Sequence, residues 1–382
     1  MNIVTDDKMT TARGLKGVVV GASAISLVDG ENGRLIYRGY SIEDLAEHST
    51  FEEVSFLLWH GRLPNRQELD ALRKQLSAEY GVPGWILDIL RKLPATMHPM
   101  DVLRTAVSAL AAADPLTEKK GREENLAKAV KLTAKTPTIA AAYDRIRKGR
   151  EPIPPDPTLS VAANFLQMLH GKPAAPEMAR ALDVILILHA DHSFNASTFA
   201  ARVTVSTESD MYAGIASAIG TLKGPLHGGA NQKVREMLGQ IRAPENAARY
   251  VKDRFAVGER IMGFGHRVYK TTDPRANILR DKSRILGEIT RKPIWFQITQ
   301  ALEEAMKSEK GGKLPPNVDL YSTSCYEYLG IDSDMSTPMF AIGRMPGWTA
   351  HVIEQLNDNM LIRPLSDYSG EQGLRYVPID KR

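Results

Sequence analysis

The sequence predicts an all-α protein of two domains with one small β-hairpin near its N-terminus. Helix start and stop signals recur along nearly the whole chain, whereas strand signals are almost confined to its beginning. With 382 residues, the chain can bury a large core, and its length favours two domains over one. An apolar fraction of 43% with 25% charged residues is typical of a globular protein.

The hairpin is predicted over residues 23–38, "SAISLVDGENGRLIYR". Two β-rich pieces flank an Asp-Gly and an Asn-Gly pair, and such pairs favour the tight turn between antiparallel strands. Helical signals take over directly after this segment.

Capping residues mark the boundaries of the first helices. Two capping boxes, and two glycines in C-cap positions, predict helices over 51–60 and 66–80. The capping boxes are Thr50 with Glu53 and Asn65 with Glu68, and the glycines are Gly61 and Gly81. Apolar periodicity predicts further helices over 99–112, 123–134, 137–148, 158–169 and 176–189. No repeat of fixed period is visible in the sequence, which argues against a solenoid.

Composition and charge exclude several classes of protein. A formal charge of +4 at pH 7 is too small to argue for nucleic-acid binding, although it suits anionic small molecules. The single cysteine, Cys325, excludes an internal disulfide framework and fits a reducing compartment. The stretch "MNIVTDDKMTTARG" has no signal-peptide core, and the longest aliphatic run, residues 184–188, is too short to span a bilayer. We therefore expect a cytoplasmic protein that binds neither nucleic acid nor membrane.

The stretch "GPLHGGAN" at residues 224–231 places His227 before two glycines. Glycines allow the close approach of a ligand or of backbone, and the helical periodicity that follows puts the imidazole at or just before a helix N-terminus. The helix dipole there disfavours imidazolium, and a neutral imidazole can donate an N–H to a carbonyl oxygen that becomes an enolate. A structural histidine in a tight turn is the alternative.

The stretch "GFGHRVYKTTDPR" at residues 263–275 contains His266, Arg267, Lys270 and Arg275. It lacks the strand and the third glycine of a dinucleotide-binding loop. Its cations suit phosphate and carboxylate groups, and a solvated basic turn is the alternative.

A third stretch, "LPPNVDLYS", places Asp319 among apolar neighbours. A carboxyl in such a setting has a raised pKa, as a general base near neutral pH requires. A plain helix cap is the alternative role.

Two further pairs of side chains are candidates for binding. His189 and His192 lie three apart on a predicted helix, but the third ligand of a catalytic zinc site is missing, so a polar contact from one histidine is favoured over a metal. Arg344 and Arg363 lie at the two ends of a predicted helical segment. Each is either a ligand for a carboxylate or an exposed surface arginine.

Taken in order and with their separations, "GPLHGGAN", "GFGHRVYKTTDPR", "NVDLYS" and "GRMPGWTAHVIEQ…IRP" resemble the citrate synthase family. Similarity extends to residues 37–64 and 98–110, and so covers nearly the whole chain. The resemblance implies a large helical domain, residues 1–228 and 331–382, that dimerises and holds oxaloacetate. It also implies a small helical domain, residues 229–330, that binds CoA and closes over the cleft.

The family condenses acetyl-CoA with oxaloacetate and water, through an enol or enolate and citryl-CoA, to give citrate and CoA. The resemblance implies that His227 stabilises the enolised thioester, Asp319 removes the methyl proton and His266 polarises and protonates the oxaloacetate carbonyl. It implies oxaloacetate binding by His192, Arg275, Arg344 and Arg363, the last from the partner subunit. It implies CoA contacts from Gly263, Phe264, Gly265 and Arg267.

The resemblance also implies a homodimer with shared active sites, in which the CoA thioester is a co-substrate and no cofactor or metal is bound permanently. The stretches "LKGVVVG" and "ARVTVSTESDMYAGIASAIG" are also similar to 2-methylcitrate synthases, which use propionyl-CoA. The sequence has Pro315 where many family members have tyrosine and Thr323 where many have glycine, and these two differences affect which acyl chain is expected to be preferred. One methylene changes selectivity by only about 1 to 3 kcal/mol, so both donors stay open, with acetyl-CoA favoured. A non-catalytic helical protein that binds acyl-CoA or metal is the alternative of another class, and Asp319 argues against it because binding alone needs no base.

Overall fold

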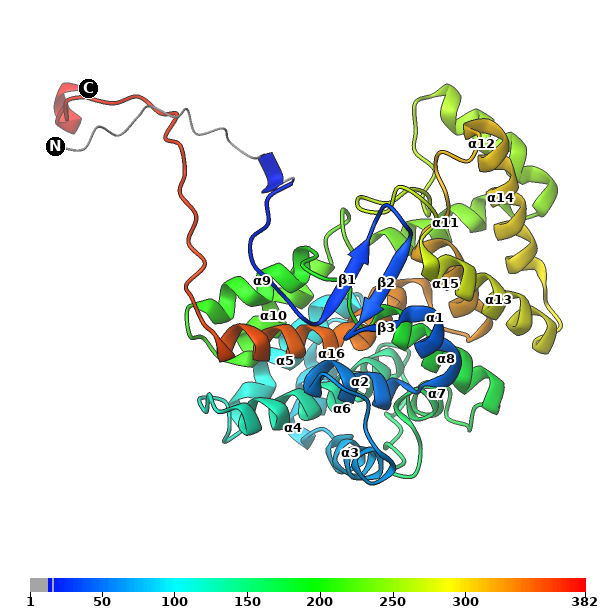
Figure 1. Cartoon of the computed structure of the whole chain (residues 1–382), viewed down its shortest axis with the longest axis horizontal. Helices are drawn as coiled ribbons and strands as arrows, with labels where there is room; N and C mark the ends of the chain where they lie inside the picture. The colour runs from blue at the N-terminus through cyan, green and yellow to red at the C-terminus, as the bar shows by residue number, and fades with distance from the viewer. Residues whose placement is uncertain (1–12, 16) are drawn as a thin grey trace.

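The computed structural model describes residues 13–15 and 17–382, so the first twelve residues, on which part of the targeting expectation rests, lie outside it. The described chain is mainly helical with one three-stranded sheet, which confirms the all-α class (Figure 1). The α-helices are α1 Ile42–His48, α2 Phe51–His60, α3 Arg66–Glu79, α4 Gly84–Lys92, α5 Pro99–Leu110, α6 Arg122–Arg147, α7 Val161–His170, α8 Pro176–His189, α9 Ala196–Ser206, α10 Met211–Leu222, α11 Ala230–Ile241, α12 Ala247–Ala256, α13 Pro274–Ile289, α14 Ile294–Lys310, α15 Val318–Tyr328 and α16 Ser336–Asn357. The strands are β1 Ser26–Asp29, β2 Arg34–Tyr37 and β3 Tyr40–Ser41, and the short 3-10 helices are η1 Arg13–Leu15, η2 Ala111–Ala113, η3 Pro244–Asn246, η4 Ser333–Met335 and η5 Ile379–Lys381.

The predicted hairpin is present as β1 and β2, antiparallel, with Ser26 facing Tyr37. The short strand β3 adds a third member that the sequence pattern did not indicate. Tyr37 is fully buried, and its hydroxyl donates to the Asp191 carbonyl over 2.9 Å while it accepts from the Asp191 amide over 3.1 Å. The hairpin is thereby attached to the chain segment just after α8.

Both predicted capping boxes are formed, at Thr50 before α2 and at Asn65 before α3. Gly61 ends α2 in the left-handed conformation, with φ of 78°, as the sequence predicted. The C-cap predicted at Gly81 is wrong, because Tyr80 ends α3 with right-handed helical backbone angles.

One continuous helix, α6, replaces the two predicted over 123–134 and 137–148. Pro137 lies inside it, and an interior proline costs a helix about 3 kcal/mol. Burial compensates, because α6 is enclosed by α3, α4, α5, α7 and α16 and buries side chains on all its faces. The Thr136 hydroxyl also donates to the Leu132 carbonyl over 2.9 Å, next to the missing backbone bond.

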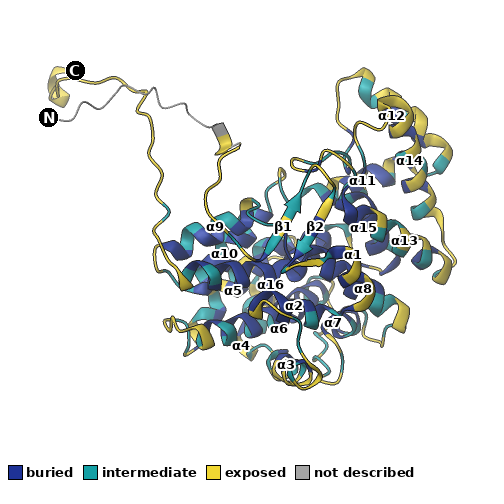
Figure 2. Ribbon diagram, viewed as in Figure 1, coloured by how far each residue is buried: buried dark blue, intermediate teal, exposed yellow. Residues whose placement is uncertain are grey.

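The helices that bear most of the core are α2, α6, α8 and α16 (Figure 2). Helices α11 to α15 pack mainly on one another and project to one side of this body (Figure 1). They fall within residues 229–330, and the division of the chain into a large and a small domain stays a prediction.

None of the described helices is long and apolar enough to cross a membrane. Beyond α16, residues 358–382 run as an extended, mostly exposed tail away from the helical body (Figures 1 and 2).

Candidate active site

His227 lies in the turn between α10 and α11, three residues before α11 begins. Its backbone N–H donates to the Gly224 carbonyl over 2.9 Å, which closes the turn. Burial, and then the charge of Arg344, lower the pKa of the imidazole to about 4. The side chain is therefore neutral near pH 7, as the sequence predicted.

The two glycines after His227 are in close contact with neighbouring residues of the chain. A Cβ on Gly228 would lie 2.7 Å from Leu222 Cδ1 and from the Leu222 carbonyl oxygen, and one on Gly229 would lie 3.1 Å from Pro225 Cα. Close approach of backbone, one of the two reasons the sequence offered for these glycines, is therefore present, and close approach of a ligand stays a prediction.

Hydrogen bonds identify the nitrogen of His227 that carries the proton. The Ser197 backbone N–H points at Nε2 over 3.3 Å, so Nε2 is an acceptor, and the Ser197 hydroxyl lies 2.9 Å from the same atom. A neutral imidazole has one donor and one acceptor, so the proton is on Nδ1. Nδ1 has no hydrogen bond to the described residues, which leaves this N–H for a ligand oxygen.

His266 has the opposite tautomer. Its Nδ1 accepts from the backbone N–H groups of Val268 and Tyr269, each over 3.0 Å. Burial, and then the Arg275 charge, lower the pKa of His266 to about 4. The ring is therefore neutral with its proton on Nε2, and its centroid lies 5.2 Å from that of His192.

Asp319 lies in the first turn of α15, after the N-cap Asn317, so the plain-cap alternative does not apply to it. The residue keeps some accessible surface, but the surrounding protein desolvates its carboxyl and raises the pKa to about 6. The side-chain amide of Asn231 donates to Oδ1 over a long 3.5 Å. A group of this pKa is ionised near pH 7 and can still take up a proton.

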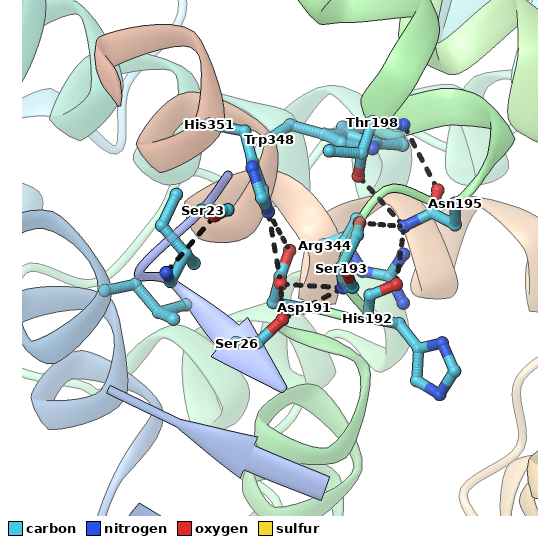
Figure 3. Close-up of polar contacts among 12 residues, drawn as sticks. Ser23, Ser26, Asp191, His192, Ser193, Asn195, Thr198, Arg344, Trp348 and His351 are labelled. Atoms are coloured by element: carbon cyan, nitrogen blue, oxygen red, sulfur yellow. Dashed lines mark hydrogen bonds and ion pairs between the residues drawn. The ribbon is translucent and has the colours of Figure 1, made fainter. Parts of the chain in front are cut away.

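His189 and His192 do not share a helix, because α8 ends at His189 and His192 lies in the loop beyond it. That loop is held by the fully buried Asp191, whose carboxylate accepts from the Ser26 hydroxyl and lies 3.2 Å from His351 Nε2. Figure 3 shows the His192 ring directed away from this cluster. Burial, and then Arg275, lower the pKa of His192 well below its usual value, and its Nε2 is buried with no partner among the described residues.

Two buried arginines face the same region. Arg344 lies in the middle of α16 rather than at a helix end, and its Nε donates to the His189 carbonyl over 2.5 Å. Its Nη1 is buried and has no partner among the described residues. Arg275 is held in two hydrogen bonds by Asp273, over 2.9 and 2.7 Å. An unpaired guanidinium nitrogen is costly, and a carboxylate would satisfy it.

The loop of Gly263, Phe264 and Gly265 is bonded to the segment that leads to Asp319. Gly265 N–H donates to the Pro315 carbonyl over 2.8 Å, and the Gly263 carbonyl accepts from Asn317 N–H over 3.0 Å. Both glycines have positive φ, and a Cβ on Gly263 would lie 3.1 Å from Leu320 Cβ. The positions require glycine for these two reasons.

Two predicted site residues lie apart from this cluster. Arg363 is exposed in the C-terminal tail, six residues beyond the end of α16, and Arg267 is exposed next to the 263–265 loop. The sequence analysis missed Ser197, Asp273 and Asn231, which position predicted residues. Asp273 and Asn231 lie within the "DPR" and "GPLHGGAN" stretches, whereas Ser197 gave no local signal.

A cavity of about 580 Å³ lies elsewhere and is lined by none of these side chains. Its cations are paired, Arg147 and Lys148 with Asp332 and Asp334, and Arg235 with Glu327. It therefore has no free charge for an anionic substrate. Among the described residues, no group of three or more His, Cys, Asp or Glu side chains is placed to hold a metal ion.

The class of protein follows from the fold and these side chains together. A buried carboxyl of raised pKa can take a proton, two neutral histidines offer N–H groups, and buried arginines suit carboxylates. This set, on an all-α scaffold, is typical of an acid–base enzyme acting on a small anionic substrate.

Comparison with known proteins identifies the family. A family model described as "Citrate synthase, C-terminal domain" matches residues 14–365. Citrate synthase 2 of Bacillus subtilis is 48% identical over 375 residues, which cover 98% of this chain and 100% of that protein. The 2-methylcitrate synthase of Mycobacterium tuberculosis is 43% identical over 96% of this chain and 92% of its own length. The structure of citrate synthase from Thermoplasma acidophilum, in a ternary complex with carboxymethyl coenzyme A and oxaloacetate, has a TM-score of 0.91 at 34% identity and covers 98% of this chain and 100% of its own. The chain belongs to the citrate synthase family, and it is an enzyme of that acyl-transferring type.

Proposed function

We propose that the enzyme condenses acetyl-CoA with oxaloacetate and water to give citrate and CoA. The observation that carries this proposal is that the structure holds both a desolvated carboxyl, Asp319, whose pKa is about 6, and a neutral imidazole, His227, whose Nδ1 has no hydrogen bond to the described residues. This pair has the parts needed to enolise a thioester. The ligands in the Thermoplasma acidophilum complex, a CoA derivative and oxaloacetate, support the same choice of substrates.

The first step forms the enol or enolate. Asp319 accepts a proton from the acetyl methyl group while His227 donates its Nδ1–H to the thioester oxygen, where charge develops. A thioester methyl is a very weak acid, so stabilisation of that oxygen is essential. Because the pKa of His227 is lowered to about 4, the group donates as a neutral imidazole.

The second step forms the carbon–carbon bond. The nucleophilic carbon attacks the keto carbon of oxaloacetate, and His266 donates its Nε2–H to the keto oxygen, which becomes the hydroxyl of citryl-CoA. His192, Arg275 and Arg344 hold the substrate carboxylates, and the unpaired Nη1 of Arg344 supports this role. Water then adds to the thioester carbonyl, and the C–S bond breaks to release CoA thiol and citrate.

We infer further that residues 229–330 move as a small domain over this site. Closure would exclude water until the bond has formed and would bring the 263–265 loop and Arg267 to CoA. A cytoplasmic location fits the single, buried Cys325.

Release of CoA thiol tests the reaction directly. It requires both acetyl-CoA and oxaloacetate if the proposal holds, and release from either alone would identify a hydrolase. The second candidate function is synthesis of 2-methylcitrate from propionyl-CoA, because the relative from Mycobacterium tuberculosis is a 2-methylcitrate synthase. Steady-state kcat/KM for the two acyl donors separates the candidates, and we expect it to favour acetyl-CoA.

We also propose a homodimer in which Arg363 completes the partner's site. The exposed tail that leads away from the helical body supports this (Figure 1). Mixed dimers of His266→Ala and Arg363→Ala chains test it, because one site in each mixed dimer combines both intact residues. Random pairing should restore about a quarter of wild-type activity. Absence of recovery in demonstrated mixed dimers would place Arg363 in the site of its own chain.

A further inference from the structure

The β1–β2 hairpin contacts two loops of the candidate active site, and its base holds the first of them. The Ser26 hydroxyl donates to the carboxylate of Asp191 and accepts from the Ser193 N–H over 2.9 Å (Figure 3). Asp191 and Ser193 are the chain neighbours of His192. The base of the hairpin therefore fixes the loop that carries His192.

The tip of the hairpin, residues 30–33, holds the second loop. The Gly30 carbonyl accepts from the Lys270 N–H over 2.9 Å, four residues beyond His266. The ring centroid of His266 lies 5.2 Å from that of His192. One short hairpin therefore joins the loops of two histidines that face each other.

The peptide group between Val268 and Tyr269 lies between the hairpin tip and His266. Its N–H, which belongs to Tyr269, donates to His266 Nδ1 over 3.0 Å. Its carbonyl, which belongs to Val268, lies against Gly30, where a Cβ would be only 2.2 Å from the oxygen. The C=O and N–H of a planar trans peptide point in opposite directions. Contact with Gly30 on the oxygen side therefore sets how far the N–H reaches toward the histidine.

Space, and not backbone conformation, requires glycine at position 30. The φ of Gly30 is not positive, in contrast to the 64° of Gly33, so alanine could adopt the same backbone. Real Cβ atoms do not approach within 3.0 Å of another heavy atom, so a methyl here must displace the Val268 oxygen by about 0.8 Å. Because the hairpin is anchored at its base, we expect the loop to be the part that moves.

We propose that Gly30 is a positioning residue that acts through the 268–269 peptide to hold His266 with Nδ1 as an acceptor and the proton on Nε2. The inference rests on the proposed role of His266 in protonating the oxaloacetate carbonyl. Because the same hairpin fixes the loop of His192, it sets the two histidines relative to each other. The contact crosses from the predicted large domain to the predicted small domain.

Gly30→Ala tests the contact directly. Displacing the peptide weakens one of the two hydrogen bonds to His266 Nδ1, so kcat should fall about three- to tenfold. Circular dichroism of the variant checks that the helical fold is retained. An unchanged kcat would overturn the proposal.

Glu31→Ala is the matched control at the hairpin tip. It removes the ion pair between Glu31 and Lys270, whose side chains are both exposed, but leaves the backbone bond of Gly30 and adds no atom. Its kcat should stay near that of the wild type, because an exposed ion pair contributes little. Equal losses in Glu31→Ala and Gly30→Ala would show a general disturbance of the tip and overturn the role of Gly30.

A second substitution separates the backbone contact from side-chain packing. A Cβ at Gly30 would also lie 3.1 Å from Val268 Cγ1. Val268→Ala removes that contact but keeps the carbonyl, so in a Gly30→Ala background it should not restore kcat. Full recovery would place the effect in side-chain packing and refute action through the peptide.

Nitrogen-15 NMR of labelled histidine reads the state of His266 without any substrate. The His266 signals, assigned from their absence in His266→Ala, should show a protonated Nε2 in the wild type and in Glu31→Ala. In Gly30→Ala the Nδ1 resonance should move toward that of a mixture of tautomers. A wild-type resonance in Gly30→Ala would overturn the proposal. If that resonance moved but the wild-type protein released no CoA, the positioning role would stand and the proposed function would be refuted.

If Gly30→Ala does not fold, Asp29→Ala gives the same comparison without an added methyl at the contact. It removes the two hydrogen bonds that Asn32 donates to the Asp29 carboxylate, over 3.1 and 2.8 Å, and so loosens the turn that presents Gly30. The Nδ1 resonance of His266 should then move in the same direction by a smaller amount. An unchanged resonance in folded Asp29→Ala would overturn the proposal.

Discussion

Lowering the pH protonates Asp319, and the proposed mechanism requires this carboxyl to be ionised. Burial raises its pKa to about 6, against an ordinary value of 3.8. Asn231 does little to oppose this shift, because its amide lies 3.5 Å from the carboxylate and makes a far shorter bond, 2.7 Å, to the Ser322 hydroxyl. Weak hydrogen bonding to the charged form leaves desolvation as the main influence.

The acid limb of the rate profile should therefore report Asp319. With a pKa of about 6, roughly 97% of the carboxyl is ionised at pH 7.5 and roughly 9% at pH 5, so kcat/KM for acetyl-CoA should fall about tenfold between them. His227 and His266, each with a pKa of about 4, stay neutral over most of this range. The acid limb of the profile therefore reports the ionisation of Asp319 and not that of the two histidines.

Initial rates of CoA release at saturating oxaloacetate, taken from about pH 5 to pH 8, measure this limb. Enzyme held at the lowest pH and returned to pH 7 before assay controls for unfolding. Asn231→Ala removes only a weak donor to the carboxylate and should move the limb slightly, toward higher pH. A flat profile, or a limb near the ordinary pKa of an aspartate, would refute burial as the source of base strength.

Three other changes test separate parts of the structure. Asp319→Asn is nearly isosteric but cannot accept a proton, so kcat should fall by roughly 10²-fold or more while oxaloacetate still binds, as measured by calorimetry. Glu52→Gln should stabilise the fold at pH 8 by roughly 1 kcal/mol, with less effect at pH 6, in urea unfolding. Burial, and then the Glu52 charge, raise the pKa of Asp183 to about 7. The free energy of unfolding therefore falls as the pH rises toward 7, and removing the Glu52 charge should recover part of that loss. Gly347→Ala should lower stability by about 1 to 3 kcal/mol, because its Cβ would lie 2.1 Å from the carbonyl oxygen that precedes Asp191; an unchanged melting temperature would contradict that packing.

Features that depend on a few consecutive residues were predictable from the sequence. The capping boxes at Thr50 and Asn65 and the hairpin turn rest on local hydrogen bonds and backbone preferences, and the structure contains them. Asp319 was predictable too, since its apolar neighbours are adjacent in the chain and burial does raise its pKa.

Predictions failed where tertiary packing outweighed local preference. Pro137 ends a helix in isolation, yet α6 continues through it because five other helices enclose it. Gly81 was predicted to cap a helix, but α3 ends at Tyr80 with right-handed helical backbone angles. For α6 the deciding contacts come from outside the local segment.

By itself, the sequence determined the helical class, the family motifs and the residue types for acid–base chemistry. Only the tertiary structure decided how those side chains are protonated and oriented. Ser197 is separated from His227 by 30 positions, and no local pattern joins them. The Ser197 backbone N–H points at His227 Nε2 and so favours a proton on Nδ1, and these two segments meet only when the chain has folded.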